Sequence, residues 1–153
     1  MANSLYFSVG GAIFYLMEEL ERLKERLRRK VVVDEDLEFL KRVDLLSDFI
    51  KLDPESGPIM EHVEDRLNQR ERILFYLFCV KAGRVLDLWD RETACVEEIA
   101  DKLGLKEKVV HARVSELMKR GLVVNVGAEK AMYKITNYGV LKVAEEVLEK
   151  LRR

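Results

Sequence analysis

Basic and hydroxyl-bearing side chains recur at helical spacing in one short part of the chain, at Lys108, His111, Ser115 and Lys119. Counted at about 100° per residue, they lie on one side of a helix together with Ala112. Ammonium and imidazole groups can bind phosphates or the acceptor atoms of guanine, and a hydroxyl group can donate or accept. The small Ala112 leaves room for close approach or meets a thymine methyl group. This side of the helix is therefore predicted to face nucleic acid.

The elements that position this face are predicted to be two short amphipathic helices joined at a glycine. In the first helix, apolar residues at helical spacing form a narrow inner face of Val96, Ile99, Ala100 and Leu103. Gly104 can take the left-handed conformation that ends a helix. The second helix is predicted over residues 106–120 and ends at Gly121. Its inner face carries Val110, Val114 and Leu117.

A β-hairpin is predicted to follow, because apolar residues alternate at period two in both of its arms. The first arm carries Leu122, Val124 and Val126, and the second carries Ala131, Tyr133 and Ile135. Residues 127–130 form the turn between the arms, and residues 94–96 are predicted to make one short strand. Thr136 is the predicted N-cap of a last helix, whose apolar stripe is Val140, Val143, Val147, Leu148 and Leu151.

The chain begins with a predicted helix whose apolar residues alternate at steps of four and three. These predicted dimerisation residues are Val9, Ile13, Leu16, Leu20, Leu23 and Leu27, a heptad spacing held for nearly three heptads. We call them the heptad seam. An exposed seam of this kind needs a partner. The sequence favours two partners equally, the next helix of the same chain and the same helix of a second copy.

Two further helices are predicted between these parts, one over residues 35–51 and one that begins at Pro58. The polar stretch 68–72 either ends the second of these or crosses solvent. The dense apolar run that follows predicts a buried helix. That helix ends at Gly83 or continues to Trp89, and the sequence does not decide between the two.

The order helix, short strand, helix, glycine turn, helix, hairpin and helix resembles the winged-helix regulators of the MarR and ArsR type. The motifs LMKRGLV at 117–123 and YKITNYG at 133–139 carry this resemblance, which covers about residues 70–153. It implies a mainly α fold with a small antiparallel β-hairpin as the wing. It also divides the chain into an N-terminal helical extension, residues 1–68, and a winged-helix DNA-binding domain, residues 69–153.

The resemblance further implies that the helix over 106–120 is a recognition helix for double-stranded DNA. Lys130 and Lys134 of the wing would then contact phosphates or the minor groove. The wing tip carries one acid beside one base, a milder charge than this family usually shows. The N-terminal helices are longer than those of the simplest members, which favours a homodimer. The predicted DNA-binding residues are Lys106, Lys108, His111, Ala112, Ser115, Lys119, Lys130 and Lys134.

Charge is distributed unevenly along the chain, whose formal net charge is only −1. Residues 1–90 hold 14 Lys and Arg against 18 Asp and Glu, which gives −4, and residues 91–153 hold 13 against 10, which gives +3. The positive part contains the predicted recognition helix and supports a nucleic-acid partner without requiring one. Gln occurs once and Thr twice while Lys, Arg and Glu abound, a usage typical of thermophile and in particular archaeal proteins.

Catalysis and metal binding have little support in the sequence. The candidate ligands His62, Cys79, Cys95 and His111 are separated by 17, 16 and 16 residues, which matches no compact metal motif. There is no glycine-rich phosphate loop and no nucleophile beside a plausible base. We therefore expect no enzyme activity, no metal and no cofactor. Neither a signal peptide nor a membrane-spanning run is recognisable, which predicts a cytoplasmic protein with no membrane partner.

Taken together, the residues predict a dimeric winged-helix transcriptional regulator that binds a specific double-stranded DNA sequence. The alternative is a winged-helix module that binds other proteins in a transcription or chromatin assembly, because fold alone does not decide function. A small-molecule effector is left open. The aromatic residues that could line its pocket serve equally well in a core, and they are Phe39, Phe49, Phe75, Tyr76, Phe78 and Trp89.

Overall fold

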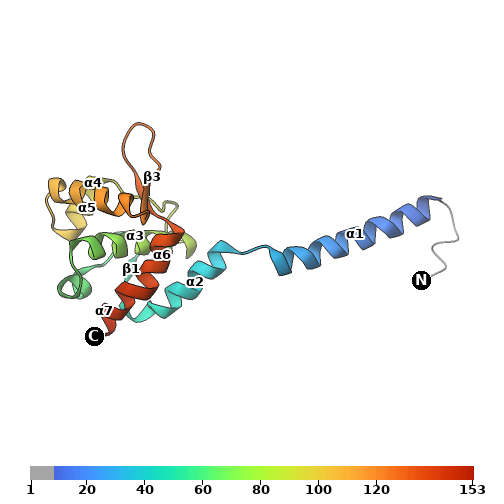
Figure 1. Cartoon of the computed structure of the whole chain (residues 1–153), viewed down its shortest axis with the longest axis horizontal. Coiled ribbons are helices and arrows are strands. Elements are labelled where there is room, and N and C mark those ends of the chain that lie inside the picture. Colours follow the sequence, from blue (N-terminus) through green and yellow to red (C-terminus); the bar gives the residue numbers. More distant parts are fainter. Residues whose placement is uncertain (1–8) are drawn as a thin grey trace. The chain divides into compact units, whose positions relative to one another are not determined.

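The computed structural model of the chain describes residues 9–153, apart from the side chain of Val9 (Figure 1). It divides into two compact units, with the division after Glu35. The division predicted between residues 68 and 69 concerns function, not compactness, and stays a prediction.

The first unit consists mainly of the helix α1, Val9–Val31. Its charged side chains pair along the helix at spacings of three and four, with Arg22–Glu19 at 3.1 Å and Arg28–Glu25 at 2.8 Å. Exposed pairs of this kind contribute about 0.2–0.5 kcal/mol each to an isolated helix. The long N-terminal helix is therefore confirmed. Within this unit the described side chains of the heptad seam are all exposed, at Ile13, Leu16, Leu20, Leu23 and Leu27.

The helix predicted over residues 35–51 is present but ends at Leu45, and shorter elements replace the helix predicted from Pro58. The first elements of the second unit are all short. They are α2 (Glu35–Leu45), the 3-10 helix η2 (Ser47–Phe49), the strands β1 (Leu52–Asp53) and β2 (Gly57–Pro58), and the 3-10 helix η3 (Glu61–Arg66). Pro58 was wrongly predicted to begin a helix, since it lies in β2 and pairs with Leu52. The Asp53 carboxylate accepts hydrogen bonds from the backbone N–H groups of Glu55 and Ser56, which reverses the chain into a hairpin.

The helix α3, Gln69–Val85, is the buried centre of this unit. The polar stretch 68–72 forms its N-cap, at Asn68, and its first turn. Asn68 Oδ1 accepts from Glu71 N and Glu71 Oε1 accepts from Asn68 N, both at 2.9 Å. The helix passes through Gly83 and ends after Val85, so neither predicted end was correct. The Trp89 ring packs directly on Gly83, in the space that a Cβ atom would need, so this position inside the helix requires glycine.

The remaining elements follow the predicted order. They are α4 (Val96–Leu103), α5 (Glu107–Lys119), β3 (Val123–Asn125), β4 (Tyr133–Ile135), α6 (Asn137–Lys142), the π-helical turn η4 (Val143–Val147) and α7 (Leu148–Arg152). The strands pair antiparallel, with Val123 opposite Ile135. The predicted strand over 94–96 is reduced to one bridge between Ala94 and Tyr133. Thr136 caps α6 as predicted, accepting from Gly139 N at 3.0 Å.

The apolar stripe predicted for the last helix is entirely buried, and so are the predicted inner faces of α4 and α5. Each Val, Leu or Ile side chain among them contributes about 1.5–3 kcal/mol on burial. The alternation predicted for the first hairpin arm is wrong, because Val124 and Val126 are exposed while Leu122 and Val123 are both buried. Leu122 still belongs to the turn that ends α5, where its N–H donates to Leu117 O at 3.0 Å. The fold is a winged helix, mostly helical with a two-stranded antiparallel hairpin.

Candidate nucleic-acid interface

The turn between α4 and α5 contains the left-handed conformation that the sequence predicted at Gly104. Gly104 adopts φ 64°, in the left-handed region, and Leu105 N–H donates to Ala100 O at 3.0 Å. The small side chain of Ala100 is buried at this point, where the two helices approach. Gly121, at φ 74°, ends α5 in the same way. The two glycines therefore fix where α4 and α5 end.

A polar contact between α3 and α4 fixes the position of the helix pair on the core. The Tyr76 hydroxyl group donates to Glu98 Oε2 at 2.5 Å, and Arg91 pairs with the same carboxylate at 3.0 Å. Burial, reinforced by the neighbouring Glu98, raises the pKa of Tyr76 well above its usual value, so this hydroxyl group stays a donor. The inner residues of α5 are buried, and α5 packs against α3, so the side chains on the opposite side of α5 face outward.

The outward side of α5, which we call the recognition face, consists of Lys108, His111, Ala112, Ser115 and Lys119. All of them are exposed except Ser115, which is half-buried. Among the residues that the structure describes, no carboxylate pairs with Lys106, Lys108 or Lys119. The segment 106–134, from the start of α5 through the wing, holds seven Lys and Arg against three Asp and Glu, which gives +4. The recognition face is thus a basic surface with cations available to an anion.

A second cluster of cations beside α5 was missed by the sequence reasoning. Glu116, which follows Ser115 on α5, pairs with Arg113 at 3.0 Å and with Arg70 at 3.4 Å. Arg70 comes from the first turn of α3, so no helical spacing could have placed it there. The carboxylate of Glu116 is neutralised by these two guanidinium groups and does not oppose an approaching phosphate.

The wing is shaped by its first strand rather than by the turn alone. Asn125 Oδ1 accepts from Gly127 N at 2.9 Å and from Met132 N at 3.1 Å. A Cβ atom on Gly127 would lie 1.8 Å from Lys130 O, so only glycine fits there. In Figure 1 the loop between β3 and β4 stands out from the helices of this unit. These contacts define the loop that would reach a second site on a bound duplex.

Both predicted wing cations are engaged within the protein. Lys130 Nζ lies 3.4 Å from Glu97 Oε2 on α4, and Lys134 Nζ lies 3.5 Å from Glu92 Oε1. The electrostatic interaction with Cys95 and the hydrogen bond to Glu97 raise the pKa of Lys130. Glu92 also binds Arg84. The structure brings the six predicted DNA-binding residues of α5 and its N-cap together, whereas these two lysines would have to leave carboxylates before they bind phosphate.

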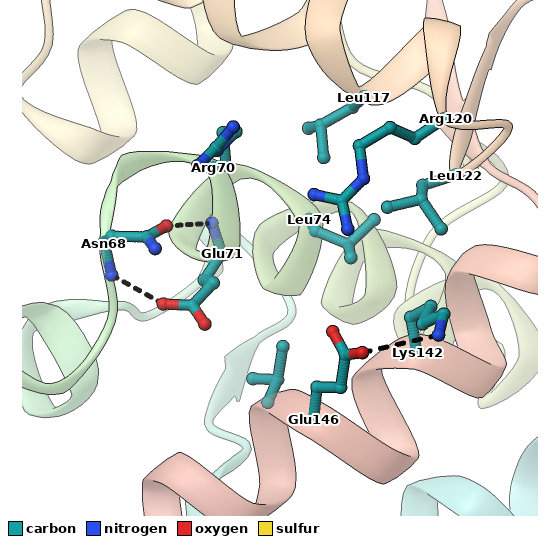
Figure 2. A pocket seen from close by; sticks show the side chains of 10 residues that line it. Asn68, Arg70, Glu71, Leu74, Leu117, Arg120, Leu122, Lys142 and Glu146 are labelled. Carbon is teal, nitrogen blue, oxygen red and sulfur yellow. Dashed lines mark hydrogen bonds and ion pairs between the residues drawn. The ribbon is translucent and has the colours of Figure 1, made fainter.

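A small hollow lies between the end of α5, the start of α3, and the segment formed by α6 and η4 (Figure 2). Its volume is about 80 Å³, whereas pockets for drug-sized ligands span about 300–1,000 Å³. Figure 2 shows Arg120 extending towards it from the end of α5 and Glu146 bound to Lys142. This hollow is too small for an effector of that size.

The aromatic residues considered for an effector pocket lie mainly in the core. Phe39, Phe75, Tyr76 and Phe78 are buried. The Phe39 and Phe78 rings are 5.1 Å apart between centroids, a spacing typical of packed aromatic pairs. Core packing therefore accounts for these four side chains.

The candidate metal ligands are separated in space as well as in sequence. His62 Nε2 lies 2.6 Å from Phe49 O, and Cys79 is buried in α3, where desolvation raises the pKa of its thiol group. Within the described part of the chain, no three His, Cys, Asp or Glu side chains gather as metal ligands would. Among the described helices, none combines the length and apolar character needed to cross a membrane.

Comparison with known proteins agrees with this geometry. No curated protein and no solved structure matches the chain. Residues 88–124 match the family described as "Winged helix-turn-helix DNA-binding". The matched segment contains α4, the glycine turn, α5 and the first residues of β3. Residues 88–124 are therefore similar to the winged helix-turn-helix DNA-binding family, and they include both helices of the candidate interface.

Proposed function

We propose that this protein is a transcriptional regulator that binds a specific sequence of double-stranded DNA as a homodimer. One observation carries the proposal. The outward side of α5 presents exposed cations to which no described carboxylate is paired, in a segment similar to DNA-binding winged helices. A basic helix of this kind fits the major groove, which is wide enough to admit an α-helix.

Each side chain of the recognition face has a role that follows from its chemistry. Lys108, His111 and Lys119 bind guanine acceptor atoms or nearby phosphates, and Ser115 can pair with either kind of base edge. Ala112 allows the helix to approach closely. Lys106, at the N-cap of α5, binds the DNA backbone. Lys130 and Lys134 bind phosphate after leaving Glu97 and Glu92.

Two copies joined through the heptad seam would present two recognition helices to one duplex. Such dimers bind half-sites about one helical turn apart, about 34–36 Å, on a roughly palindromic sequence. The N-terminal part, residues 1–68, thus serves dimerisation and residues 69–153 serve DNA binding. The charge pattern, the motifs and the long N-terminal helix support a cytoplasmic regulator of the MarR or ArsR type. We propose no enzymatic step for it.

The experiment that tests DNA binding is fluorescence anisotropy with duplex DNA, with charge reversal at Lys108 and Lys119. The alternative, a module that binds other proteins in a transcription assembly, is favoured by a different observation. The overall charge is −1 and both wing lysines are paired with carboxylates. The two functions differ in salt dependence, because only phosphate binding releases counterions in proportion to the contacts made.

A further inference from the structure

The apolar residues of the heptad seam indicate what kind of partner could cover it. In heptad notation Ile13, Leu20 and Leu27 occupy a positions, while Leu16 and Leu23 occupy d positions. Their exposed fractions run from 43% to 64%. Burial of these side chains requires a second apolar stripe of the same spacing. Leucine at the described apolar d positions, with no isoleucine among them, agrees with two strands.

We propose that α1 pairs with α1 of a second copy of this chain as a parallel, two-stranded coiled coil. This inference rests on the homodimer of the proposed function and adds its orientation and register. The residues that flank the seam indicate which helix covers it and in which orientation.

The flanking positions are complementary in a parallel pair. Glu19 occupies a g position and Lys24 the e position five residues later. In a parallel coiled coil, a g residue faces the e residue of the next heptad on the partner helix. Glu19 of one copy therefore faces Lys24 of the other, and two-fold symmetry makes this pair twice. The other described g and e positions that would face each other combine Ala12 with Met17 and Arg26 with Val31, so no like charges meet.

An antiparallel pair in full register would place like charges together. Its layers would join Ile13 to Leu23 and Leu16 to Leu20, which centres the two-fold axis near residue 18. Glu19 of one copy would then face Glu19 of the other across this axis, because g positions meet g positions in antiparallel coils. Lys24 would face Gly10 and have no carboxylate opposite it. The parallel arrangement gains two attractive pairs and avoids one repulsive pair.

Orientation has a consequence for DNA binding that follows from chain connectivity. In a parallel coil both chains leave α1 at the same end, so both second units start from one place. In an antiparallel coil the two exits lie at opposite ends of a helix of 23 residues, which rises about 1.5 Å for each residue. A parallel coil therefore limits how far apart the two recognition helices can lie, which favours binding to neighbouring half-sites on one duplex.

Disulfide trapping in the full-length chain tests the orientation. Lys30 lies at a d position in the last turn of α1, opposite its own counterpart in a parallel coil and at the far end from it in an antiparallel one. We expect Lys30→Cys, made in a Cys95→Ser background, to form a disulfide-linked dimer in most molecules under mild oxidation. Glu25→Cys, at an outward f position, is the matched control and should remain mostly reduced as a single chain.

Three results would overturn the proposal. One is a dimer by sedimentation whose Lys30→Cys variant does not cross-link above the Glu25→Cys control, which means an antiparallel pair. The others are a monomer at tens of micromolar and a trimer. None of these depends on DNA, so binding of duplex by the same preparations distinguishes failure of the coiled coil from failure of the recognition face.

Charge reversal tests the register. Lys24→Glu places a second carboxylate opposite Glu19 of the partner, so we expect the dimer dissociation constant to rise roughly tenfold. The double variant Glu19→Lys/Lys24→Glu restores opposite charges and should recover most of the loss. Lys24→Glu also breaks the ion pair between Lys24 and Glu21 within the helix. The control is therefore Glu18→Lys at an f position, which breaks the pair between Glu18 and Arg22 and should leave dimerisation within roughly threefold of the wild type. Absence of recovery in the double variant would contradict the register.

Discussion

Lys130 Nζ on the wing lies 3.4 Å from Glu97 Oε2 on α4, so an ion pair joins the hairpin to the first helix of the helix-turn-helix. The Lys130 side chain is 63% exposed, against 38% for Lys134, so it is the more accessible of the two wing lysines. We expect Glu97→Gln to strengthen DNA binding by roughly three- to tenfold at low salt, because it releases Lys130 and removes one repulsive charge. Anisotropy titrations with one duplex would measure this change.

A double variant separates the two causes of that gain. If release of Lys130 matters, Glu97→Gln/Lys130→Ala loses most of the gain. Glu129→Gln removes one negative charge from the wing tip and is the control for general repulsion. An equal gain from Glu129→Gln would show that the ion pair between Lys130 and Glu97 has no specific role.

Glu92 predicts a pH dependence of stability. Burial alone would raise the pKa of this carboxyl group, but the hydrogen bond and charge of Arg84, with help from nearby lysines, lower it below the ordinary value of 4.5. A lowered folded pKa contributes stability above the unfolded pKa, and this contribution is lost as pH falls through the lower folded value. Wild type should therefore exceed Glu92→Gln in thermal stability near about pH 7, and the difference should shrink towards about pH 3. A difference that stays constant would contradict this account.

Gly83 predicts a clash when a methyl group is added. A Cβ atom there would lie 1.9 Å from Trp89 Cζ2, and the Trp89 indole N–H donates to Val80 O at 2.8 Å. Although alanine normally stabilises a helix interior relative to glycine, we expect Gly83→Ala to lower the free energy of unfolding by about 2–3 kcal/mol. Urea denaturation followed by the fluorescence of Trp89, the one tryptophan, would measure the loss.

The cause can be checked by a double-mutant cycle. In a Trp89→Ala background the ring is absent, so Gly83→Ala should cost less than about 0.5 kcal/mol or should stabilise. This cycle is followed by circular dichroism, since it lacks the fluorophore. Equal losses in both backgrounds would show that the clash is elsewhere.

Sequence patterns predicted the parts of this fold that depend on neighbours along the chain. The inner residues Val110, Val114 and Leu117 are buried as their spacing indicated, and the turn at Gly104 follows from its conformational freedom. The same reasoning placed Lys108 and Lys119 on the outward side of α5, where both are exposed.

The parts that failed depend on contacts between distant segments. Pro58 suits the first turn of a helix, but the Asp53 turn draws it into a strand opposite Leu52. Glycine often ends a helix, but Gly83 lies inside α3, because the Trp89 ring fills the space that a side chain at this position would occupy. Glu97 and Lys130 are 33 positions apart, and only the folded chain places them together.

The most direct test of the central claim is the anisotropy of labelled duplex DNA, titrated with full-length protein across a salt series. Four proteins are compared: the wild type, Lys108→Glu/Lys119→Glu, a charge-matched control and a second variant of the recognition face. Lys41→Glu/Lys51→Glu makes the same change in net charge at α2 and just before β1, and Ala112→Glu places one carboxylate on the recognition face. Far-ultraviolet circular dichroism verifies that each variant is folded.

We predict that wild type binds with an affinity that falls steeply as salt rises, with a slope near −0.9 for each phosphate contact in a double-logarithmic plot. Lys108→Glu/Lys119→Glu should lose at least roughly a hundredfold in affinity and flatten the slope by about two contacts, and Ala112→Glu should bind poorly as well. The Lys41→Glu/Lys51→Glu control should stay within roughly fivefold of wild type. Negligible wild-type binding at low salt, or equal binding by the recognition-face variant and its control, would contradict the assignment of α5 as a DNA-binding helix.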